Sequence, residues 1–387
     1  MRILHVVRGL LNSSGTTHIV VPVAEEQARI GHEVTVAFVE KDGRPAVEPD
    51  AALVTSWNFP QSIRWSNPGI SFPFARSLNR QISNFDVLHV HAIWNFPTFV
   101  SMRAARRASV PYIVAPQGSL EPWALGQKAI GKRIYGAFTE VPLLQNATFM
   151  QALTSNEAEQ MNRFGLKSPI EIIPNGINED SFDIDAAPLT RRLDLTSDQK
   201  TLLFLSRLHP KKGVDVLIRA FASLAARRTD VTLVIAGHDA GSGYGNELAN
   251  LSQQLGLGDR CRFIGEVQGS EKYQALLGAD GFVLTSHSEG LPVAVVEAMA
   301  AGLPVLITPG CNIPEVEDWQ AGYIVEPEPD AVVKGMAMMF DDPEHARAMG
   351  DRGRLLVREK FTWKRIARRM CDVYADMQDT NERPRAA

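Results

Sequence analysis

The sequence contains, at Thr285–Val305, the stretch TSHSEGLPVAVVEAMAAGLPV. An apolar run ends near Thr285, and a turn that contains a glycine follows it. Pro292 stands where the first residue of a helix is favoured, because the missing amide of a proline costs nothing there. Gly302 fits the left-handed stop of that helix, and Pro304 opens the next apolar run. The stretch therefore predicts a strand, a turn, a helix and a second strand, which is the repeating unit of an α/β fold.

Two glutamates occupy this unit at different depths. Glu289 precedes the predicted helix, and Glu297 lies ~8 Å along the helix axis from Pro292 at a rise of about 1.5 Å per residue. The helix start between them offers free amides and a positive dipole end to an anion such as a diphosphate. The two carboxylates can then accept hydrogen bonds from hydroxyls at opposite ends of a sugar–diphosphate–ribose molecule. A solvated helix face is the alternative explanation.

The same alternation of short apolar runs and longer amphipathic ones extends along the whole chain, as in parallel α/β sheets. A predicted helix, Thr17–Ile30, ends at Gly31. The predicted strands of the first half are Ile3–Val7, Val34–Val39, Val87–His91, Tyr112–Ala115, Phe149–Leu153 and Ile170–Ile173. Those of the second half are Leu202–Leu205, Leu233–Ala236, Arg262–Ile264, Gly281–Thr285 and Val305–Ile307.

The boundary between two domains is expected near residue 180. Pro174-Asn175-Gly176 is strong turn chemistry, and the polar residues 178–199 suggest a linker. We expect one domain over residues 1–180 and a second over 195–360, followed by a long amphipathic helix at about 361–378. Two doubly wound domains would bind a ligand at the carboxyl ends of their strands.

Composition narrows the class of protein. The 387 residues include 40 Lys and Arg against 44 Asp and Glu, a net charge of -4, which argues against a nucleic-acid partner. The 3 cysteines are far apart and form no CxxC pair, so neither a disulfide framework nor a zinc site is indicated. The first apolar run is too short for a signal peptide, and no run approaches the roughly 18 residues of a membrane span. A cytoplasmic protein, at most peripheral on a membrane, is expected.

A basic loop follows the first strand of the second half, in the run FLSRLHPKKGVD at 204–215. Arg207 and Lys212 lie near the start of a predicted helix. Two fixed cations there suit a pyrophosphate leaving group, since they stabilise negative charge that grows as a bond to phosphate oxygen breaks. A basic surface loop is the alternative.

Together these residues resemble a known family. The run from Glu289 to Glu297 resembles the E-x7-E signature of glycosyltransferase family 4, whose members have the GT-B fold of two Rossmann-like domains facing a central cleft. The resemblance implies that Glu289 contacts the donor sugar, that Glu297 contacts the ribose, and that Arg207 and Lys212 hold the diphosphate. It also assigns the amides of Gly290 and Leu291 to the phosphates.

The first domain matches the family less closely. Ser13–Thr17 occupies the position of a Gly-Gly loop that faces phosphate, but it contains Gly15 alone. His91 ends a predicted strand near the cleft, and it is a catalytic candidate or a core histidine. The run PQGSLEPWAL at 116–125 has Gln117 where relatives often carry a histidine, and an amide cannot take up a proton as an imidazole does. His91 and Gln117 are the expected acceptor side.

These matches run in order from residue 1 to about 375. The resemblance implies an acceptor-binding first domain, a donor-binding second domain and a C-terminal helix that crosses back to the first domain. It implies a retaining enzyme, with Arg207, Lys212 and Glu289 as catalytic residues. The enzyme would move a hexosyl unit from a nucleotide-diphosphate sugar to a glycan or lipid-linked acceptor in polysaccharide biosynthesis. No cofactor and no metal are expected.

Two other functions remain open on the sequence. A nucleotide-sugar epimerase can share the fold, and a catalytically degenerate binding protein would explain Gln117 and the single Gly15.

The Asp-x-Asp at Asp183–Asp185, a metal motif in other transferases, falls in the expected linker. Ser101–Gly136 carries six basic residues and one acid, a patch that suits an anionic membrane or an ordinary solvated face. The six are Arg103, Arg106, Arg107, Lys128, Lys132 and Arg133.

Overall fold

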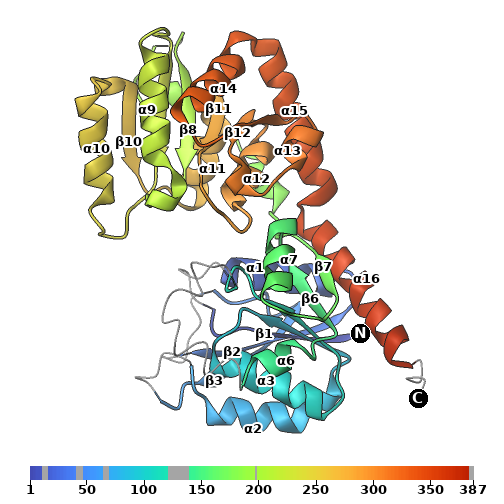
Figure 1. Cartoon of the computed structure of the whole chain (residues 1–387). Coiled ribbons are helices and arrows are strands. Elements are labelled where there is room, and N and C mark those ends of the chain that lie inside the picture. The colour runs from blue at the N-terminus through green and yellow to red at the C-terminus, as the bar shows by residue number, and fades with distance from the viewer. Residues whose placement is uncertain (11–15, 41–46, 64–68, 121–138, 197, 383–387) are drawn as a thin grey trace. The chain divides into compact units, whose positions relative to one another are not determined.

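The structure is a computed structural model that describes residues 1–10, 16–40, 47–63, 69–120, 139–196 and 198–382. The chain divides into two compact units. Unit 1 comprises Met1–Gly176 and Trp363–Ala387, and unit 2 comprises Ile177–Thr362. Each unit is a doubly wound parallel sheet covered by helices (Figure 1).

Unit 1 contains a 7-stranded parallel sheet in the order β3-β2-β1-β4-β5-β6-β7. Its strands are β1 (Arg2–Val6), β2 (Glu33–Glu40), β3 (Val54–Pro60), β4 (Val87–His91), β5 (Tyr112–Ala115), β6 (Phe149–Ala152) and β7 (Ile170–Ile172). The strand order reverses between β1 and β4, and His5 pairs directly with His89 there. Such a switch point leaves a crevice at the carboxyl ends of the two strands, where α/β proteins bind ligands.

Helices from the first half of the chain and the C-terminal helix cover the unit 1 sheet. They are α1 (Thr17–Arg29), α2 (Phe72–Gln81), α3 (Phe96–Arg107), α6 (Val141–Leu144), α7 (Ser155–Arg163) and α16 (Trp363–Glu382). The C-terminal α16 packs against α1, and its apolar stripe joins the core of unit 1 (Figure 1). The stripe includes Ile366, Met370 and Tyr374, whose spacing of four residues puts them on one helix face. The last helix thus belongs to the first unit, as the resemblance implied.

Unit 2 contains a 6-stranded parallel sheet in the order β10-β9-β8-β11-β12-β13. Its strands are β8 (Lys200–Leu205), β9 (Val231–Ala236), β10 (Cys261–Gly265), β11 (Gly281–Leu284), β12 (Val305–Ile307) and β13 (Gly322–Ile324). Its longer helices are α9 (Val214–Ala225), α10 (Tyr244–Gln254), α11 (Gly269–Gly278), α12 (Val293–Ala301), α14 (Pro329–Asp341) and α15 (Pro343–Lys360). The switch point of this sheet lies between β8 and β11.

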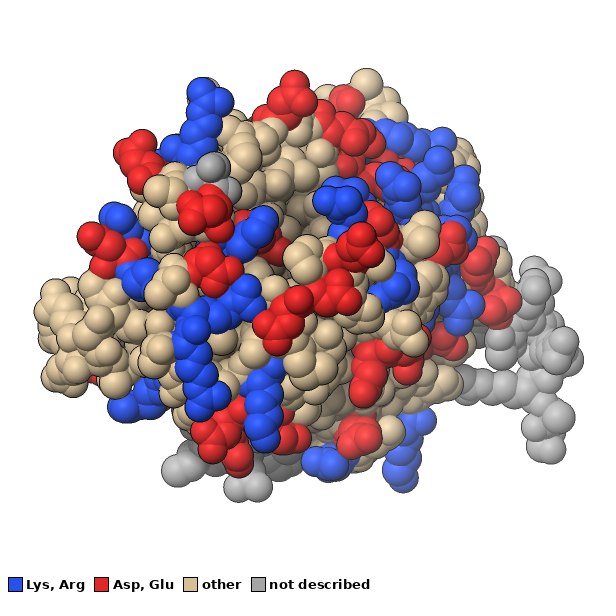
Figure 2. Space-filling view, turned by 90° about the horizontal axis from the view of Figure 1, so that it is seen from above, with Lys and Arg blue, Asp and Glu red and all other residues tan. Residues whose placement is uncertain are grey.

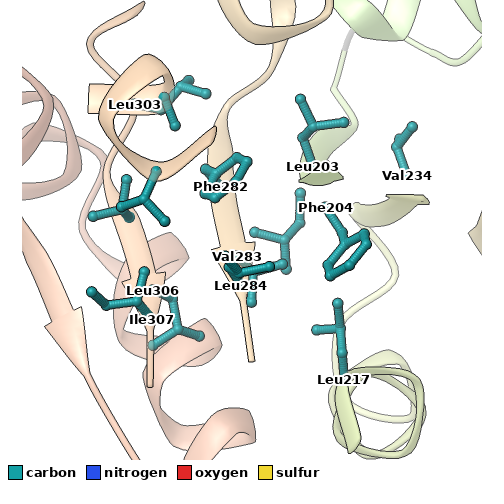
Figure 3. Close-up of a cluster of buried hydrophobic side chains, with 14 of the residues drawn as sticks. Leu203, Phe204, Leu217, Val234, Phe282, Val283, Leu284, Leu303, Leu306 and Ile307 are labelled. Carbon is teal, nitrogen blue, oxygen red and sulfur yellow. The ribbon is translucent and has the colours of Figure 1, made fainter. Parts of the chain in front are cut away.

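The central strands of unit 2 are buried on both faces. Phe204 of β8, Phe282 of β11 and Leu306 of β12 are fully buried, and Leu217 of α9 packs into the same core (Figure 3). This explains why the strands appear in the sequence as continuous apolar runs, since helices cover both faces of a parallel sheet. The sheet therefore holds the loops at its carboxyl edge on a rigid base.

The structure differs from the predicted elements at several positions. The expected linker at 178–199 is not a free linker over its described residues: they contain the 3-10 turn Glu179–Phe182 and α8 (Leu189–Arg192), and Leu189 is buried in unit 2. The chain enters unit 2 directly after Gly176, where the expected first domain extended to residue 180. Two further strands, β3 and β13, lie at sheet edges and lack an apolar run. Pro292 is the cap of α12, which begins at Val293, and Gly302 ends it at a φ of 81°.

Charged side chains of both signs lie on the face of the molecule in Figure 2. On the face that Figure 2 shows, basic and acidic groups alternate and form no continuous area of one sign. No helix among the described residues is long and apolar enough to cross a membrane.

Candidate functional site

The loops after β8 and β11 meet at the switch point of unit 2. Gly213 has a φ of 62°, and a Cβ at this position would collide with the carbonyl oxygen of Thr285. The Thr285 hydroxyl donates to the Gly213 carbonyl at 2.8 Å, and the His287 amide donates to the Lys211 carbonyl at 2.9 Å. A residue without a side chain is therefore needed for the two loops to join.

The joined loops bring Lys212 and Glu289 together. The Lys212 Nζ lies 2.5 Å from the Glu289 Oε1, and the two side chains are only 13% and 10% exposed. The Ser286 hydroxyl donates to the same carboxylate oxygen at 2.6 Å. The sequence predicted both charged residues at a diphosphate and sugar site, and the structure adds their direct ion pair.

A third loop, after β12, holds the backbone of Glu289. The Glu289 amide donates to the Gly310 carbonyl at 2.7 Å, and the Asn312 side chain donates to the Glu289 carbonyl at 2.5 Å. Gly310 is required because a Cβ there would meet the backbone of Ser286 and His287. Sequence reasoning missed Ser286 and Asn312. Ser286 was adjacent to the motif, whereas no local pattern pointed to Asn312.

Glu297 has a different cation from Glu289. It lies on the buried side of α12, and its carboxylate is 2.6 Å from the Nζ of Lys272 on α11. Burial opposes the charge of Lys272, but Glu297 and the adjacent Tyr273 outweigh it and raise the pKa of this ammonium. The Lys272 Nζ also lies 4.7 Å from the centre of the Tyr273 ring. Lys272 is a site residue that the sequence did not indicate.

The remaining predicted residues of unit 2 follow the same strands in the sequence. Arg207 follows β8, is exposed, and forms no ion pair with another described residue. Gly290 and Leu291 link Glu289 to α12, and no side chain caps that helix. The Val295 amide donates to the Pro292 carbonyl at 3.0 Å, and the amides of Val293 and Ala294, which have no acceptor among the described residues, are available to an anion. Asp183 and Asp185 are exposed after the 3-10 turn at Glu179–Phe182, away from the loops that carry Lys212 and Glu289 in sequence.

At the switch point of unit 1 the structure gathers three histidines. His5 on β1 and His89 and His91 on β4 are fully buried, and their ligand nitrogens lie within 4.8 Å of one another. Burial lowers the pKa of His5 to about 4 and the pKa values of His89 and His91 well below the ordinary range. Three neutral imidazoles could hold a metal ion. Sequence reasoning singled out His91 and missed the approach of His5.

Hydrogen bonds already occupy most of these ring nitrogens. His5 Nδ1 lies 2.9 Å from His91 Nε2, and His89 Nδ1 lies 2.7 Å from the Tyr374 hydroxyl. Gln117 contacts His91 through its amide nitrogen, 3.3 Å from His91 Nδ1. The two predicted acceptor-side residues therefore form one contact. Gly15, the other predicted residue of this unit, lies outside the described residues.

Buried carboxylates hold the loops at the same edge of the unit 1 sheet. The Leu10 amide donates to Glu40 at 2.9 Å, and the Gly118 amide donates to Glu157 at 2.7 Å. The Trp94 amide donates to Glu140 at 2.9 Å. Burial raises the pKa of Glu140 to about 7, although the bond from Trp94 opposes this shift.

The backbone at this edge is also unusual. Ala92, Trp94 and Gln117 have φ values of 61°, 67° and 52°, a region that favours glycine. Such strain persists only where the surroundings impose it, and it concentrates at ligand sites. Two doubly wound units, each with a polar cluster at its switch point, define a two-Rossmann protein of the GT-B class.

Comparison with known proteins identifies the family. The family described as glycosyl transferases group 1 matches residues 188–356, and the glycosyl transferase 4-like domain matches residues 14–176. A mannosyltransferase of Mycobacterium tuberculosis is 31% identical over 359 residues, which cover 88% of this chain and 89% of the relative. It is named a GDP-mannose-dependent alpha-(1-6)-phosphatidylinositol monomannoside mannosyltransferase. The chain belongs to the group 1 glycosyl transferases and is a glycosyltransferase of family 4 type.

Other similar proteins agree with this assignment. The D-inositol 3-phosphate glycosyltransferase of Streptomyces avermitilis is 29% identical over 320 residues, covering 78% of this chain and 68% of the relative. HepE of Anabaena, solved in complex with UDP and glucose, superposes with a TM-score of 0.74 at 19% identity. That match covers 97% of this chain and 100% of HepE, and it shows the shared GT-B fold.

Proposed function

We propose that this glycosyltransferase moves a hexosyl unit from a nucleotide-diphosphate sugar, with retention of configuration, to a glycan or lipid-linked acceptor. The single observation that carries the proposal is the ion pair of Lys212 and Glu289 at the switch point of unit 2. Relatives support the donor class, since one is named as GDP-mannose-dependent and HepE was solved with UDP. Polysaccharide biosynthesis is the proposed setting.

The proposed roles follow from the charge of each group. Lys212, Arg207 and the amides of Gly290 and Leu291 bind the diphosphate, because cations and a helix start both attract phosphate oxygens. Glu289 accepts hydrogen bonds from sugar hydroxyls. When the donor binds, its phosphate competes with Glu289 for Lys212, and its hydroxyls satisfy the carboxylate that Lys212 releases.

Glu297 accepts the ribose hydroxyls in this proposal. Lys272 neutralises its charge and fixes its position, because the pair is held at 2.6 Å and Glu297 is nearly buried. The Lys272 ammonium bonds to Oε1 of Glu297.

Charge stabilisation of the leaving group is the proposed source of catalysis. As the glycosidic bond breaks, negative charge grows on the departing phosphate, and in this proposal Lys212, Arg207 and the start of α12 stabilise it. The departing oxygen then takes the proton of the acceptor hydroxyl, on the same face as the attack. No metal ion and no cofactor take part in the proposed reaction.

The proposed acceptor side is unit 1, around His91 and Gln117. A lipid-linked acceptor would require contact with a membrane, and the arginines of two adjacent helices support this. Arg76 and Arg80 on α2 and Arg106 on α3 are exposed and form no ion pair with another described residue. Phe72, at the start of α2, is 62% exposed. Cations beside an exposed aromatic suit an anionic lipid surface.

Of the patch expected from the sequence, Arg103 and Arg107 are also exposed on α3. Lys128, Lys132 and Arg133 lie outside the described residues.

Vesicles that contain anionic lipid should bind the wild-type protein, and they should not bind the Arg76→Glu/Arg80→Glu variant. The matched control is Arg191→Glu/Arg192→Glu on α8 of unit 2. Equal binding of both variants would contradict the membrane contact.

The central experiment is a thermal-shift screen of nucleotide sugars, followed by product analysis. A donor that binds only the folded protein raises the melting temperature by mass action. We expect one nucleotide sugar to stabilise the protein and to yield a transferred sugar with the donor's anomeric configuration. A changed sugar without an acceptor would indicate an epimerase, and stabilisation without turnover across acceptors would indicate a binding protein.

A further inference from the structure

A continuous chain of buried polar side chains connects α16 to the end of β5 within unit 1. Its members come from β1, α1, β4, α16 and the loop after β5, and all but Gln117 are buried. In order they are Gln117, His91, His5, Gln27, Tyr374 and His89. The donor and acceptor capacity of each group fixes the direction of the chain.

Gln27 sets the direction. Its amide nitrogen lies 3.3 Å from the Tyr374 hydroxyl and 4.0 Å from the sulfur of Met370. A thioether has lone pairs and no proton to donate, so the group that faces Met370 is the NH2 of the amide. The Gln27 oxygen then faces His5 Nε2 at 2.7 Å. His5 must therefore carry its proton on Nε2.

The position of the proton on His5 determines which atom donates and which accepts in each hydrogen bond as far as Gln117. With Nε2 protonated, His5 Nδ1 is a lone pair, and His91 donates to it from Nε2 at 2.9 Å. His91 Nδ1 is in turn a lone pair and accepts from the Gln117 NH2 at 3.3 Å. The Gln117 oxygen remains, and it is buried without a hydrogen-bond partner among the described residues.

The other branch of the chain runs from Gln27 through Tyr374 to His89. The Tyr374 hydroxyl accepts from Gln27 and donates to His89 Nδ1 at 2.7 Å. His89 then carries its proton on Nε2, a buried nitrogen that has no hydrogen-bond partner among the described residues. Burial keeps His5 neutral, with its pKa lowered to about 4, so protonation does not interrupt the chain at neutral pH.

We propose that this chain presents the Oε1 of Gln117 to the substrate, so that the group bound there is a hydrogen-bond donor, namely a hydroxyl of the acceptor. An unpartnered buried acceptor destabilises the structure, and a bound hydroxyl would satisfy it. A phosphate or carboxylate would instead face the oxygen with its own lone pairs. His91, His5, Gln27 and Tyr374 are positioning residues that fix the polarity of Gln117.

The geometry of Gln117 supports a built site. Its φ of 52° is left-handed, and the amide of the next residue, Gly118, is held by the buried Glu157. Both constraints turn the side chain of Gln117 toward His91. The chemical identity of this position as an acceptor rests on the proposed transfer function, whereas the direction of the chain does not.

The first test measures imidazole tautomers by nitrogen NMR in the full-length protein labelled at histidine. We expect His5, His89 and His91 to be neutral with the proton on Nε2, and the exposed His345 provides a reference signal. In Gln117→Glu the side chain cannot donate to His91, so His91 should gain a proton on Nδ1. Gln27→Met should leave His5 in a mixture of tautomers, because Met has no oxygen to accept from Nε2.

Two results would overturn the direction of the chain: an Nδ1-protonated His5 or His91 in the wild type, or Gln117→Glu with an unchanged His91. Stoichiometric binding of added Zn²⁺ with shifts of all three histidine signals would overturn it as well, since the nitrogens would then be metal ligands. None of these measurements depends on turnover, so they stand apart from the outcome of the transfer assay.

The second test measures transfer to octyl glycosides. We expect Gln117→Met to raise the KM for the acceptor about five- to tenfold, the effect of one neutral hydrogen bond, with the KM for the donor unchanged. Gln117→Glu, which keeps an accepting oxygen, should bind the acceptor better than Gln117→Met. An equal KM for the acceptor in all three proteins would contradict the hydroxyl contact.

Discussion

Burial of the Lys212–Glu289 ion pair costs free energy, because both charged groups lose most of their hydration. We therefore expect the pair to have a role in ligand binding. Each is nearly buried, and the Ser286 hydroxyl supplies a further bond to the carboxylate. Such pairs contribute little net stability, yet the loss of one partner is expensive. On donor binding, a phosphate would pair with Lys212 in place of Glu289, and sugar hydroxyls would donate hydrogen bonds to Glu289. Both charged groups would then keep a partner.

Substitution of one partner should therefore cost more than substitution of both. We expect Lys212→Met to lower the free energy of unfolding by about 3 kcal/mol, since Glu289 is left buried and unpaired. Lys212→Met/Glu289→Gln should recover at least half of that loss, as measured by urea unfolding. The neighbouring Lys211→Met is the control. Additive effects of the two substitutions would show that the pair is not coupled.

Glu140 is the second residue whose environment makes a testable difference. Its pKa is raised to about 7 by burial, so the folded protein holds a proton that the unfolded chain has released. Stability from this group is full at acidic pH and is lost as pH rises toward 7. The buried histidines act in the opposite direction, so the comparison must be made with a variant at this one position.

Glu140→Gln keeps an acceptor for the Trp94 amide and removes the titration. Between about pH 4.5 and 7 the wild type should lose about 3 kcal/mol of unfolding free energy relative to Glu140→Gln. Chemical denaturation of both proteins at pH 5 and pH 8 measures this difference. If the difference in unfolding free energy were the same at both pH values, Glu140 would not titrate in this range.

The site residues that the sequence predicted belong to local sequence motifs, whereas those that it missed contact residues far away in the sequence. Glu289 and Glu297 could be predicted because a turn, a proline and a glycine stop surround them within one short stretch. Lys272 and His5 could not be predicted, because each meets its partner only after distant elements pack together. The sequence therefore predicted the individual charged residues, and the structure was needed to show which residues lie in contact with them.

At the scale of elements, the site depends on how closely the loops after β8, β11 and β12 approach one another. Gly213 and Gly310 lie where any Cβ would collide with the neighbouring loop. The sequence predicted the helix that ends at Gly302, because its stop signal is local. It placed a linker at 178–199 since those residues are polar, and there the packing of Leu189 into unit 2 outweighed composition.

Gly213→Ala tests whether this close approach is required. We expect it to lower the free energy of unfolding by about 1–3 kcal/mol more than Gly241→Ala, because overpacking adds to the cost of the left-handed conformation. Gly241 is a matched control: its φ is 78°, and a Cβ there meets nothing within 4 Å. Equal losses in urea unfolding would mean that the loops can separate without cost.

At the scale of the molecule, the chain crosses between the two units twice, after Gly176 and after Thr362. The second crossing lets α16 complete the core of unit 1, although it is the last helix of the chain. The amphipathic pattern predicted that this helix covers an apolar surface, and the family resemblance was needed to say which one. The two edge strands β3 and β13 escaped prediction because neither carries a buried apolar run.

Truncation of a buried side chain on α16 should therefore destabilise unit 1. Ile366→Ala should cost about 2–5 kcal/mol, the usual range for a core residue of this size, whereas the exposed Lys364→Ala should change stability by less than about 0.5 kcal/mol. Hydrogen exchange, compared between the strands of the two units, measures where protection is lost. Protection lost in unit 2 alone would contradict the assignment of α16 to unit 1.

The proposed function depends most on the binding of a nucleotide-sugar diphosphate to unit 2 through Lys212. Calorimetric titration of UDP and of GDP into the wild type, Lys212→Ala and Lys211→Ala tests it most directly. We predict that one nucleoside diphosphate binds the wild type and Lys211→Ala alike, and binds Lys212→Ala about ten- to a hundredfold more weakly, as expected for a charged hydrogen bond. Equal affinity for all three proteins, or no binding to the wild type, would contradict the account.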